Sequence, residues 1–266
     1  MGKESTVRLL LDRGADVNAQ GGEYGNALQA AAQRSDNDAT VRLLLDRGAD
    51  VNAQGGCYGN ALQAAAQPSG SQSAVRLLLD RGADVNAQGG LYGNALQAAA
   101  NEATVRLLLD SGADVNAQGG EYGNALQAAA LRSGNDTVVR LLLDRGAKVN
   151  AQGGSYGNAL QAAALRTGND TTVRLLLDHG ADVNAHGGLY GNALQAAALR
   201  SGNDATVRLL LDRGADVNAQ GGKHGNALQA AAREGKESTV RILLSCGASL
   251  NDLDEKYRAQ YMRFVE

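Results

Sequence analysis

The chain has 266 residues and a net charge of −3, with acidic and basic residues mixed along its length. No basic stripe is present and no apolar run is long enough to cross a membrane, which argues against nucleic acid or a bilayer as the main partner. The two cysteines, Cys57 and Cys246, have no regular spacing, which indicates reduced thiols in an intracellular compartment, cytoplasmic or nuclear.

Residues 1–16 predict one helix that ends near Gly14. Later in the chain, the same sequence motif is always preceded by another predicted helix. Residues 1–16 therefore predict a half repeat that has only the second helix. Leu9, Leu10 and Leu11 are then partly uncovered, where a terminal repeat should be polar. We expect either that the chain is the tail of a longer array or that this end docks on something.

The opening MGKEST also fits the N-myristoylation pattern. However, GKESTVR at Gly2–Arg8 recurs at Gly235–Arg241, inside the array, where it must serve the fold. A helix start is therefore the favoured interpretation.

Residues 17–251 repeat one phrase seven times. The glycine of the Tyr/His-Gly-Asn triplet recurs at intervals of 34, 34, 30, 34, 34 and 34 residues, at Gly25, Gly59, Gly93, Gly123, Gly157, Gly191 and Gly225. A period of this size is typical of stacked helical repeats, which form one quasi-linear domain.

Each repeat predicts helix, turn, helix and extended loop. Asn26 is a good N-cap and Gln29 stands where it can reach back to the cap. Leu28, Ala31 and Ala32 share one face of a thin first helix.

The polar stretch 35–38 ends the first helix, and Asn37 or Asp38 can cap the second. Val41, Leu44 and Leu45 follow helical spacing, and Gly48 is a left-handed C-cap residue. Each buried Leu contributes about 1.5–3 kcal/mol, but only where a neighbouring repeat covers it.

The repeat at 94–112 lacks four residues of its inter-helix turn. We predict a shortened helix pair that reverses near Asn101-Glu102, because Asn tolerates left-handed geometry. The alternative is one continuous helix from Asn94 to Asp110.

Residues 252–266 predict a capping helix. Leu253, Tyr257 and Tyr261 are four residues apart, with Phe264 near the same face. This stripe favours a core that closes over the last repeat rather than a binding surface.

The stretch GNALQAAA…TVRLLLDRGADVNAQ resembles the ankyrin repeat over residues 3–251. This resemblance implies an all-α solenoid of stacked helix-turn-helix units joined by extended loops, and a protein-binding scaffold. Asn26-Ala27 and Gln29 replace the usual Thr-Pro and His. The wording NAQGGxYGNALQAA is similar to the ankyrin arrays of fungal NACHT-type (STAND) receptors, although no nucleotide-binding motif is present.

No arrangement predicts catalysis, a cofactor or a metal. His179, His186 and His224 each replace a different repeat residue, without converging ligands. The glycine loops do not follow a buried strand, as a phosphate-binding loop must. We therefore expect no enzyme.

Two columns of the alignment vary while their neighbours hardly change. The first lies at the loop tip: Glu23, Cys57, Leu91, Glu121, Ser155, Leu189 and Lys223. The second follows the Ala triplet: Gln33, Gln67, Asn101, Leu131, Leu165, Leu199 and Arg233. By resemblance to ankyrin repeats, both columns face a concave groove.

We expect the leucines of both columns to be exposed and to bind a protein partner, centred on the repeats from Leu91 to Leu199. Six tyrosines, among them Tyr92, Tyr122, Tyr156 and Tyr190, adjoin the first column and either join the interface or pack under the loops. The candidate partner site comprises the first column, these four tyrosines, Leu131, Leu165, Leu199 and Arg233. The competing hypothesis is an architectural spacer, or a sensor-tail fragment of a larger STAND-type receptor without a binding role of its own.

Overall fold

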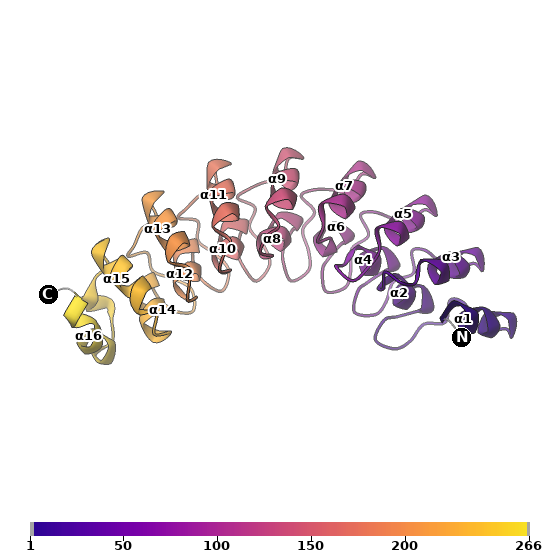
Figure 1. The fold of residues 1–266 in the computed structure, drawn as a ribbon, viewed down its shortest axis with the longest axis horizontal. Coiled ribbons are helices and arrows are strands. Elements are labelled where there is room, and N and C mark those ends of the chain that lie inside the picture. Colours follow the sequence, from indigo (N-terminus) through magenta and orange to yellow (C-terminus); the bar gives the residue numbers. More distant parts are fainter. Residues whose placement is uncertain (1–2, 265–266) are drawn as a thin grey trace. The chain divides into compact units, whose positions relative to one another are not determined.

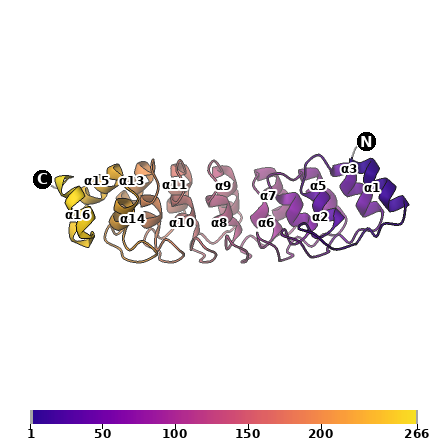
Figure 2. The same cartoon turned by 90° about the horizontal axis from the view of Figure 1, so that it is seen from below.

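The computed structural model describes residues 3–264, so Met1 and Gly2 of the myristoylation-type pattern lie outside the described residues. The chain divides into two compact parts, residues 1–125 and 126–266, called here the N-terminal part and the C-terminal part. Within each part the helices of successive repeats lie side by side (Figure 1). Within each part, the loops that join the repeats lie along one edge of the helices (Figure 2).

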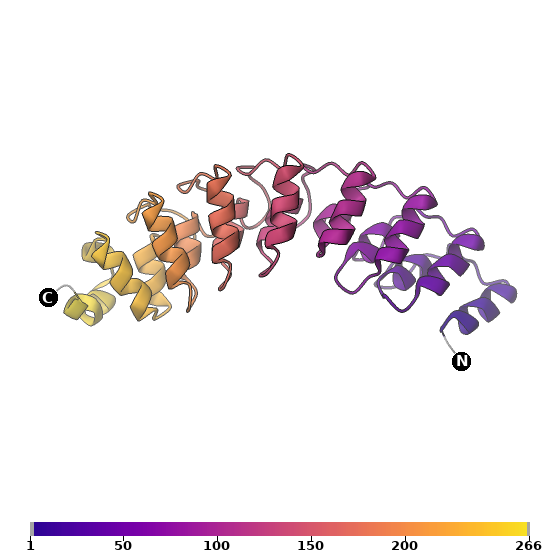
Figure 3. The same ribbon diagram turned by 45° about the horizontal axis from the view of Figure 1, so that its top comes forward.

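The fold is all-α, built from stacked helix pairs. The first helices are α2 Ala27–Ala32, α4 Ala61–Ala66, α6 Ala95–Ala98, α8 Ala125–Ala130, α10 Ala159–Ala164, α12 Ala193–Ala198 and α14 Ala227–Arg233. The second helices are α1 Lys3–Asp12, α3 Asp38–Asp46, α5 Gln72–Asp80, α7 Glu102–Asp110, α9 Asp136–Asp144, α11 Asp170–Asp178, α13 Asp204–Asp212 and α15 Glu237–Ser245. The second helices of each part form a row (Figure 3).

The first helices begin as the sequence predicts. Asn26 Oδ1 accepts a hydrogen bond from the Gln29 amide at 2.9 Å, and Gln29 Oε1 accepts one from the Asn26 amide at 2.9 Å. The same reciprocal pair forms between Asn158 and Gln161. This capping box satisfies two amides that a six-residue helix would otherwise leave unpaired.

The core of each repeat lies between its two helices and those of the next repeat. Leu28, Val41 and Leu44 are almost completely buried. Leu43 is buried as well, whereas Leu45, which follows the same helical spacing as Val41 and Leu44, is only half-buried. Gly48 ends the second helix with φ +86°, as predicted for a left-handed C-cap.

The second helix has the predicted residue at its N-cap, but the predicted capping hydrogen bond is absent. Asn37 occupies the cap position, but its side chain makes no capping hydrogen bond. In the C-terminal part the equivalent Asn169 Nδ2 donates to Ala130 O of the preceding repeat at 2.8 Å, and Asn203 Nδ2 donates to Ala164 O at 2.9 Å. At positions 169 and 203 this asparagine therefore ties neighbouring repeats together.

The short repeat keeps two helices, as predicted, because α6 ends at Ala98 and α7 begins at Glu102. The role of Asn101 differs from the prediction. Its φ of −117° and ψ of 150° are extended, and its side chain caps α7 by accepting from the Thr104 amide at 2.8 Å. An N-cap, rather than a left-handed residue, separates the helices.

The C-terminal segment is not one helix but η1 Leu250–Asp252, α16 Glu255–Tyr261 and η2 Met262–Phe264. Leu253 and Tyr261 are buried, while Tyr257 is half-buried. The Tyr261 and Phe264 rings lie 5.7 Å apart, and the Arg241 guanidinium lies 4.1 Å from the Phe264 centroid. The apolar stripe expected from the sequence is thus buried mainly at its two ends.

Candidate functional site: the loop edge

Each loop between repeats folds back at a glycine hairpin. The Gly55 amide donates to Gly59 O at 2.8 Å, and the two residues form an isolated β-bridge. Gly56 has φ +61°, and a Cβ there would lie 2.3 Å from the Tyr24 carbonyl carbon. The loop therefore approaches the preceding repeat too closely for any other residue, and the hairpin brings Cys57 to the loop tip.

The variable loop-tip residues are joined by a backbone ladder. In the N-terminal part the Cys57 amide donates to Glu23 O at 2.9 Å, Leu91 to Cys57 O at 3.0 Å, and Glu121 to Leu91 O at 3.2 Å. In the C-terminal part, Leu189 donates to Ser155 O and Lys223 donates to Leu189 O, each at 3.0 Å. Since the backbone makes these contacts, the side chains can vary without breaking the stack.

Most side chains of this column are open to solvent. Five are exposed (Glu23, Leu91, Glu121, Leu189 and Lys223), whereas Cys57 and Ser155 are half-buried. Leu91 is 52% exposed and Leu189 is 56% exposed, which distinguishes them from the buried leucines of the helices. Each part therefore carries one large apolar side chain at its loop edge.

The loop tyrosines stack between neighbouring repeats. Ring centroids are 6.1 Å apart for Tyr24–Tyr58, 5.9 Å for Tyr92–Tyr122 and 6.4 Å for Tyr156–Tyr190, and all six rings are half-buried. The arrangement matches packing under the loops and still leaves part of each ring in contact with solvent.

Tyr58 is further held by its hydroxyl, which accepts a hydrogen bond from Gln33 Nε2 at 2.8 Å. Burial raises the pKa of Tyr58 above its ordinary value, and the neighbouring Cys57, Tyr24 and Tyr92 raise the pKa further. The phenol is therefore neutral at physiological pH.

The second variable column is not the exposed surface that we expected. Leu131 is 6% exposed and Leu165 is 5% exposed, so both belong to the core. The physical reason is the turn of the following repeat, since Arg166 Nε donates to Leu131 O at 3.0 Å and holds that turn over the end of α8. Leu131 and Leu165 are therefore removed from the candidate partner site.

The rest of this column is divided. Leu199 is half-buried, whereas Arg233 is exposed and lies 3.8 Å from the Asp254 carboxylate. Gln67 is buried, and Asn101 is exposed but is used as a helix cap. Position after the Ala triplet does not by itself decide exposure.

A protein-family model described as "Ankyrin repeats (3 copies)" matches residues 1–89, 95–187 and 160–254. The chain belongs to the ankyrin repeat family. The crystal structure of the human ASB11 ankyrin repeat domain is similar, with a TM-score of 0.69 and 26% sequence identity over 84% of this chain and 99% of that one. No curated protein matches the chain in sequence. Ankyrin repeat domains generally act as protein-interaction modules.

Residues 3–264 contain no group of three or more His, Cys, Asp or Glu side chains that could hold a metal ion. His179 Nδ1 lies 2.7 Å from Leu175 O, at the end of α11. Cys57 and Cys246 are free thiols. Among the described helices, none is both long and apolar enough to span a bilayer.

Two repeated side chains do more than the sequence indicated. Besides capping its own helix, Gln29 donates from Nε2 to the carbonyls of Ala53, Gly55 and Gly59 in the next loop, at 3.1, 3.2 and 3.1 Å. The signal available in the sequence was the constancy of this glutamine in every ankyrin repeat. A cap alone would tolerate Glu, but only the amide group can also donate to the loop carbonyls.

The second such residue is the asparagine of the Val-Asn-Ala triplet. Asn52 Nδ2 donates to Gly82 O at 3.0 Å, and Asn52 Oδ1 accepts from the Asp84 amide at 2.8 Å. Asn18 and Asn184 bridge neighbouring ankyrin repeats in the same way. These side-chain amides fix the position of each loop relative to the next loop and so align the loop tips within each part.

Proposed function

We propose that the chain binds a protein partner through its loop edge, anchored by Leu91 in the N-terminal part and by Leu189 in the C-terminal part. The observation that carries the proposal is the exposure of these two leucines at the one loop position that varies freely. An exposed Leu gains about 1.5–3 kcal/mol when a partner buries it. The half-buried tyrosine rings beside them add aromatic surface, which interfaces favour.

The charges beside the two leucines differ. In the N-terminal part, the exposed Glu23 and Glu121 share the backbone ladder with Leu91. In the C-terminal part, Leu189 is followed by the exposed Lys223. Complementary charge sets partner choice and association rate. The partner segment at Leu91 should therefore be apolar with basic neighbours, and the segment at Leu189 should be apolar with acidic neighbours.

A narrower proposal rests on the repeated phrase itself. Its similarity to the arrays of fungal NACHT-type receptors supports a role as the sensor region of such a receptor. The opposing hypothesis is an architectural spacer, for which the loop-edge leucines have no partner. Identifying the proteins that contact Leu91 and Leu189 in the cell distinguishes these two hypotheses.

The test places a photo-crosslinking amino acid at Leu91 or at Leu189 in the cells that make the protein. Matched positions are Arg42 and Arg140, which are exposed on second helices of the same two parts. A partner bound at the loop edge crosslinks from Leu91 or Leu189 and not from Arg42 or Arg140.

The purified partner should then bind Leu91→Gln or Leu189→Gln about tenfold or more weakly than the unchanged chain, since each anchor is worth at least 1.4 kcal/mol. Equal crosslinking from loop and helix positions, or unchanged affinity of both variants, contradicts the proposal and favours the spacer.

A further inference from the structure

One junction between two second helices carries arginines without a counter-charge. In the N-terminal part α3 and α5 lie side by side (Figure 3), and a hollow of about 330 Å³ lies between them. It is lined by Arg42 of α3 and by Gln72, Ser73, Arg76, Leu77 and Asp80 of α5. Both arginines are exposed, and within residues 3–264 neither guanidinium has an ion pair or a side-chain hydrogen bond. Two sets of unused donors therefore face this hollow.

The lack of a counter-charge on α5 follows from one residue of the sequence. The helices α3, α7, α9, α11, α13 and α15 all begin with an acidic residue, whereas α5 begins with Gln72. In α7 that acid is Glu102, which pairs with Arg106 at 2.7 Å. The equivalent arginine of α5, Arg76, has no acid in this position. The neutral Gln72 thus leaves Arg76 available to another anion.

The neighbouring acids are either occupied or distant. Asp38 of α3 accepts a hydrogen bond from the Ser71 hydroxyl at 3.1 Å, and Asp46 pairs with an arginine of the next repeat at 2.7 Å. The acid in the lining of the hollow, Asp80, lies seven residues after Ser73 in the sequence. That separation is about 10 Å along the helix axis. The end of the hollow nearest Ser73 is therefore positive.

A serine hydroxyl lies at this positive end. Ser73 is exposed, and its hydroxyl has no hydrogen-bond partner among the described residues. It is the second residue of the nine-residue helix α5, and Arg76 lies on the same side of the helix three residues later. Negative charge is favoured in the first turn of a helix by the helix dipole. Position 73 is thus suited to a side chain that becomes an anion.

We propose that Ser73 is a phosphorylation site, whose phosphate binds Arg42 and Arg76 and so holds α3 against α5. The phosphoryl donor is a nucleoside triphosphate bound to a protein kinase. The bond between Ser73 Oγ and the γ-phosphorus forms as the bond to the leaving nucleoside diphosphate breaks, and a base of the kinase takes the hydroxyl proton. The phosphate carries a charge of about −1.5 to −2 and three acceptor oxygens, which suit two guanidinium groups. This modification is independent of the loop edge proposed above.

The equivalent serine of α15 provides a control within the same chain. Ser238 is also exposed and lines a hollow of about 330 Å³ with Arg208 and Arg241. However, this hollow also contains Asp204, and Glu237 directly precedes the serine. Arg241 already lies over an aromatic ring. A phosphate on Ser238 would therefore lie beside two carboxylates and gain little.

The first test asks whether Ser73 accepts phosphate. The purified full chain is incubated with nucleoside triphosphate, phosphatase inhibitors and an extract of the cells that make it, and phosphate is mapped by mass spectrometry. The chain isolated from those cells is mapped in the same way. We expect phosphate on Ser73 and none on Ser238. If the peptide containing Ser73 is detected only without phosphate in both samples, the proposal is overturned.

The second test asks whether the phosphate binds the arginines. Phosphoserine is incorporated at position 73 or at position 238 during synthesis of the full chain, and amide hydrogen exchange is compared with that of the unmodified chain. Phosphoserine at position 73 should slow exchange in α3 and α5 about tenfold, the effect of one charge-assisted hydrogen bond. Phosphoserine at position 238 should change exchange in α15 by less than about twofold.

Two arginine variants complete this test. Arg42→Gln should abolish the slower exchange caused by phosphoserine at position 73 and leave the unmodified chain unchanged, because exposed Arg42 has no ion pair there. Arg174→Gln, at the equivalent exposed position of α11, should preserve the slower exchange. Slower exchange that survives Arg42→Gln, or that is equal for phosphoserine at both positions, overturns the proposal. The helix dipole alone would then account for the effect.

Discussion

The two ends of the molecule contain the same seven residues in opposite surroundings. Of the copy at residues 2–8, Lys3–Arg8 form the start of α1, whereas the copy at residues 235–241 precedes and enters α15. Thr6 is exposed and Val7 half-buried in α1, whereas Thr239 and Val240 are 1% and 0% exposed in α15. The local sequence specifies a helix in both places, but burial depends on the neighbour.

The arginine of this heptapeptide shows the same dependence. In α1, Arg8 pairs with Glu4 at 2.7 Å on the helix surface, where such a pair contributes only a few tenths of a kcal/mol. In α15, Arg241 instead lies over the Phe264 ring. A side chain that is a surface charge at one end is thus a packing partner at the other.

The largest effect on stability should come from removing the C-terminal segment that follows α15. Deleting Asp252–Glu266 removes the buried side chains of Leu253 and Tyr261. Burial of each side chain stabilises the fold by about 1.5–3 kcal/mol, so the free energy of unfolding should fall by about 3–6 kcal/mol. Chemical denaturation followed by circular dichroism measures this loss. An unchanged melting temperature would refute the role of this segment as a cap.

Equivalent leucines at the two ends should differ next. Leu243 is completely buried in α15, and Leu243→Ala should cost about 2–5 kcal/mol of unfolding free energy. Leu10 is 55% exposed, and Leu10→Ala should change the unfolding free energy by less than about 0.5 kcal/mol. Similar losses for both variants, in the same denaturation assay, would mean that Leu10 is covered in solution.

The contrast between covered and uncovered copies extends to the second variable column. Leu131→Gln should lower the unfolding free energy by about 2 kcal/mol, because it buries an amide without a partner. Arg233→Gln, in the same column but exposed, should change it by less than about 0.5 kcal/mol. If Leu131→Gln is silent in thermal unfolding, the leucine is accessible after all.

The smallest effect should come from one of the two polar contacts that Asp252 makes with the residues at the start of α14. Asn226 Nδ2 donates to the Asp252 carboxylate at 2.8 Å, and Gln229 Nε2 donates to the Asp252 carbonyl at 2.6 Å. Asp252→Ala removes the first contact and keeps the second, so a loss of about 1 kcal/mol is expected. Hydrogen exchange at the amides of α14 would show whether that loss is local, and unaltered protection would argue that solvent replaces the carboxylate.

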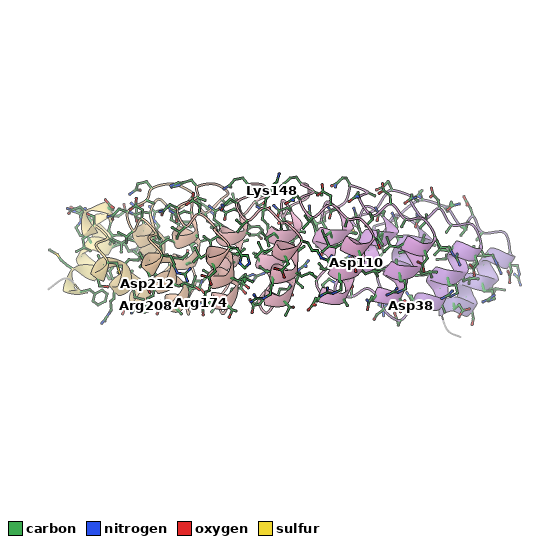
Figure 4. All side chains as sticks on the ribbon, turned by 90° about the horizontal axis from the view of Figure 1, so that it is seen from above. Asp38, Asp110, Lys148, Arg174, Arg208 and Asp212 are labelled. Atoms are coloured by element: carbon green, nitrogen blue, oxygen red, sulfur yellow. The ribbon has the colours of Figure 1, made fainter. Side chains whose placement is uncertain are left out.

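Exposed charged residues on the second helices do not vary from repeat to repeat as the loop-tip residues do. Arg174 of α11 and Arg208 of α13 are equivalent residues on the helices, while Lys148 lies on the loop edge (Figure 4). The arginines are the same in nearly every repeat although they are exposed. We therefore place the candidate site on the varying loop tips rather than on the constant helix surface.

Most of the fold follows from short-range chemistry, so the sequence alone was sufficient to predict it. The 34-residue period, the Asn26–Gln29 capping box and the left-handed Gly48 depend only on residues near one another in the chain. The two helices of the short repeat were also predicted, although the cap formed by Asn101 was not.

Only the tertiary structure decided which face of each helix is covered. Leu131 and Leu199 follow the same Ala triplet, yet one is buried and the other half-buried. The second role of Gln29, as a donor to the next loop, likewise depends on residues 24 to 30 positions away. In a repeat array, equivalent residues lie in nearly the same local sequence. Their environments therefore differ mainly through the repeat that stacks on them, and that stacking is a long-range contact.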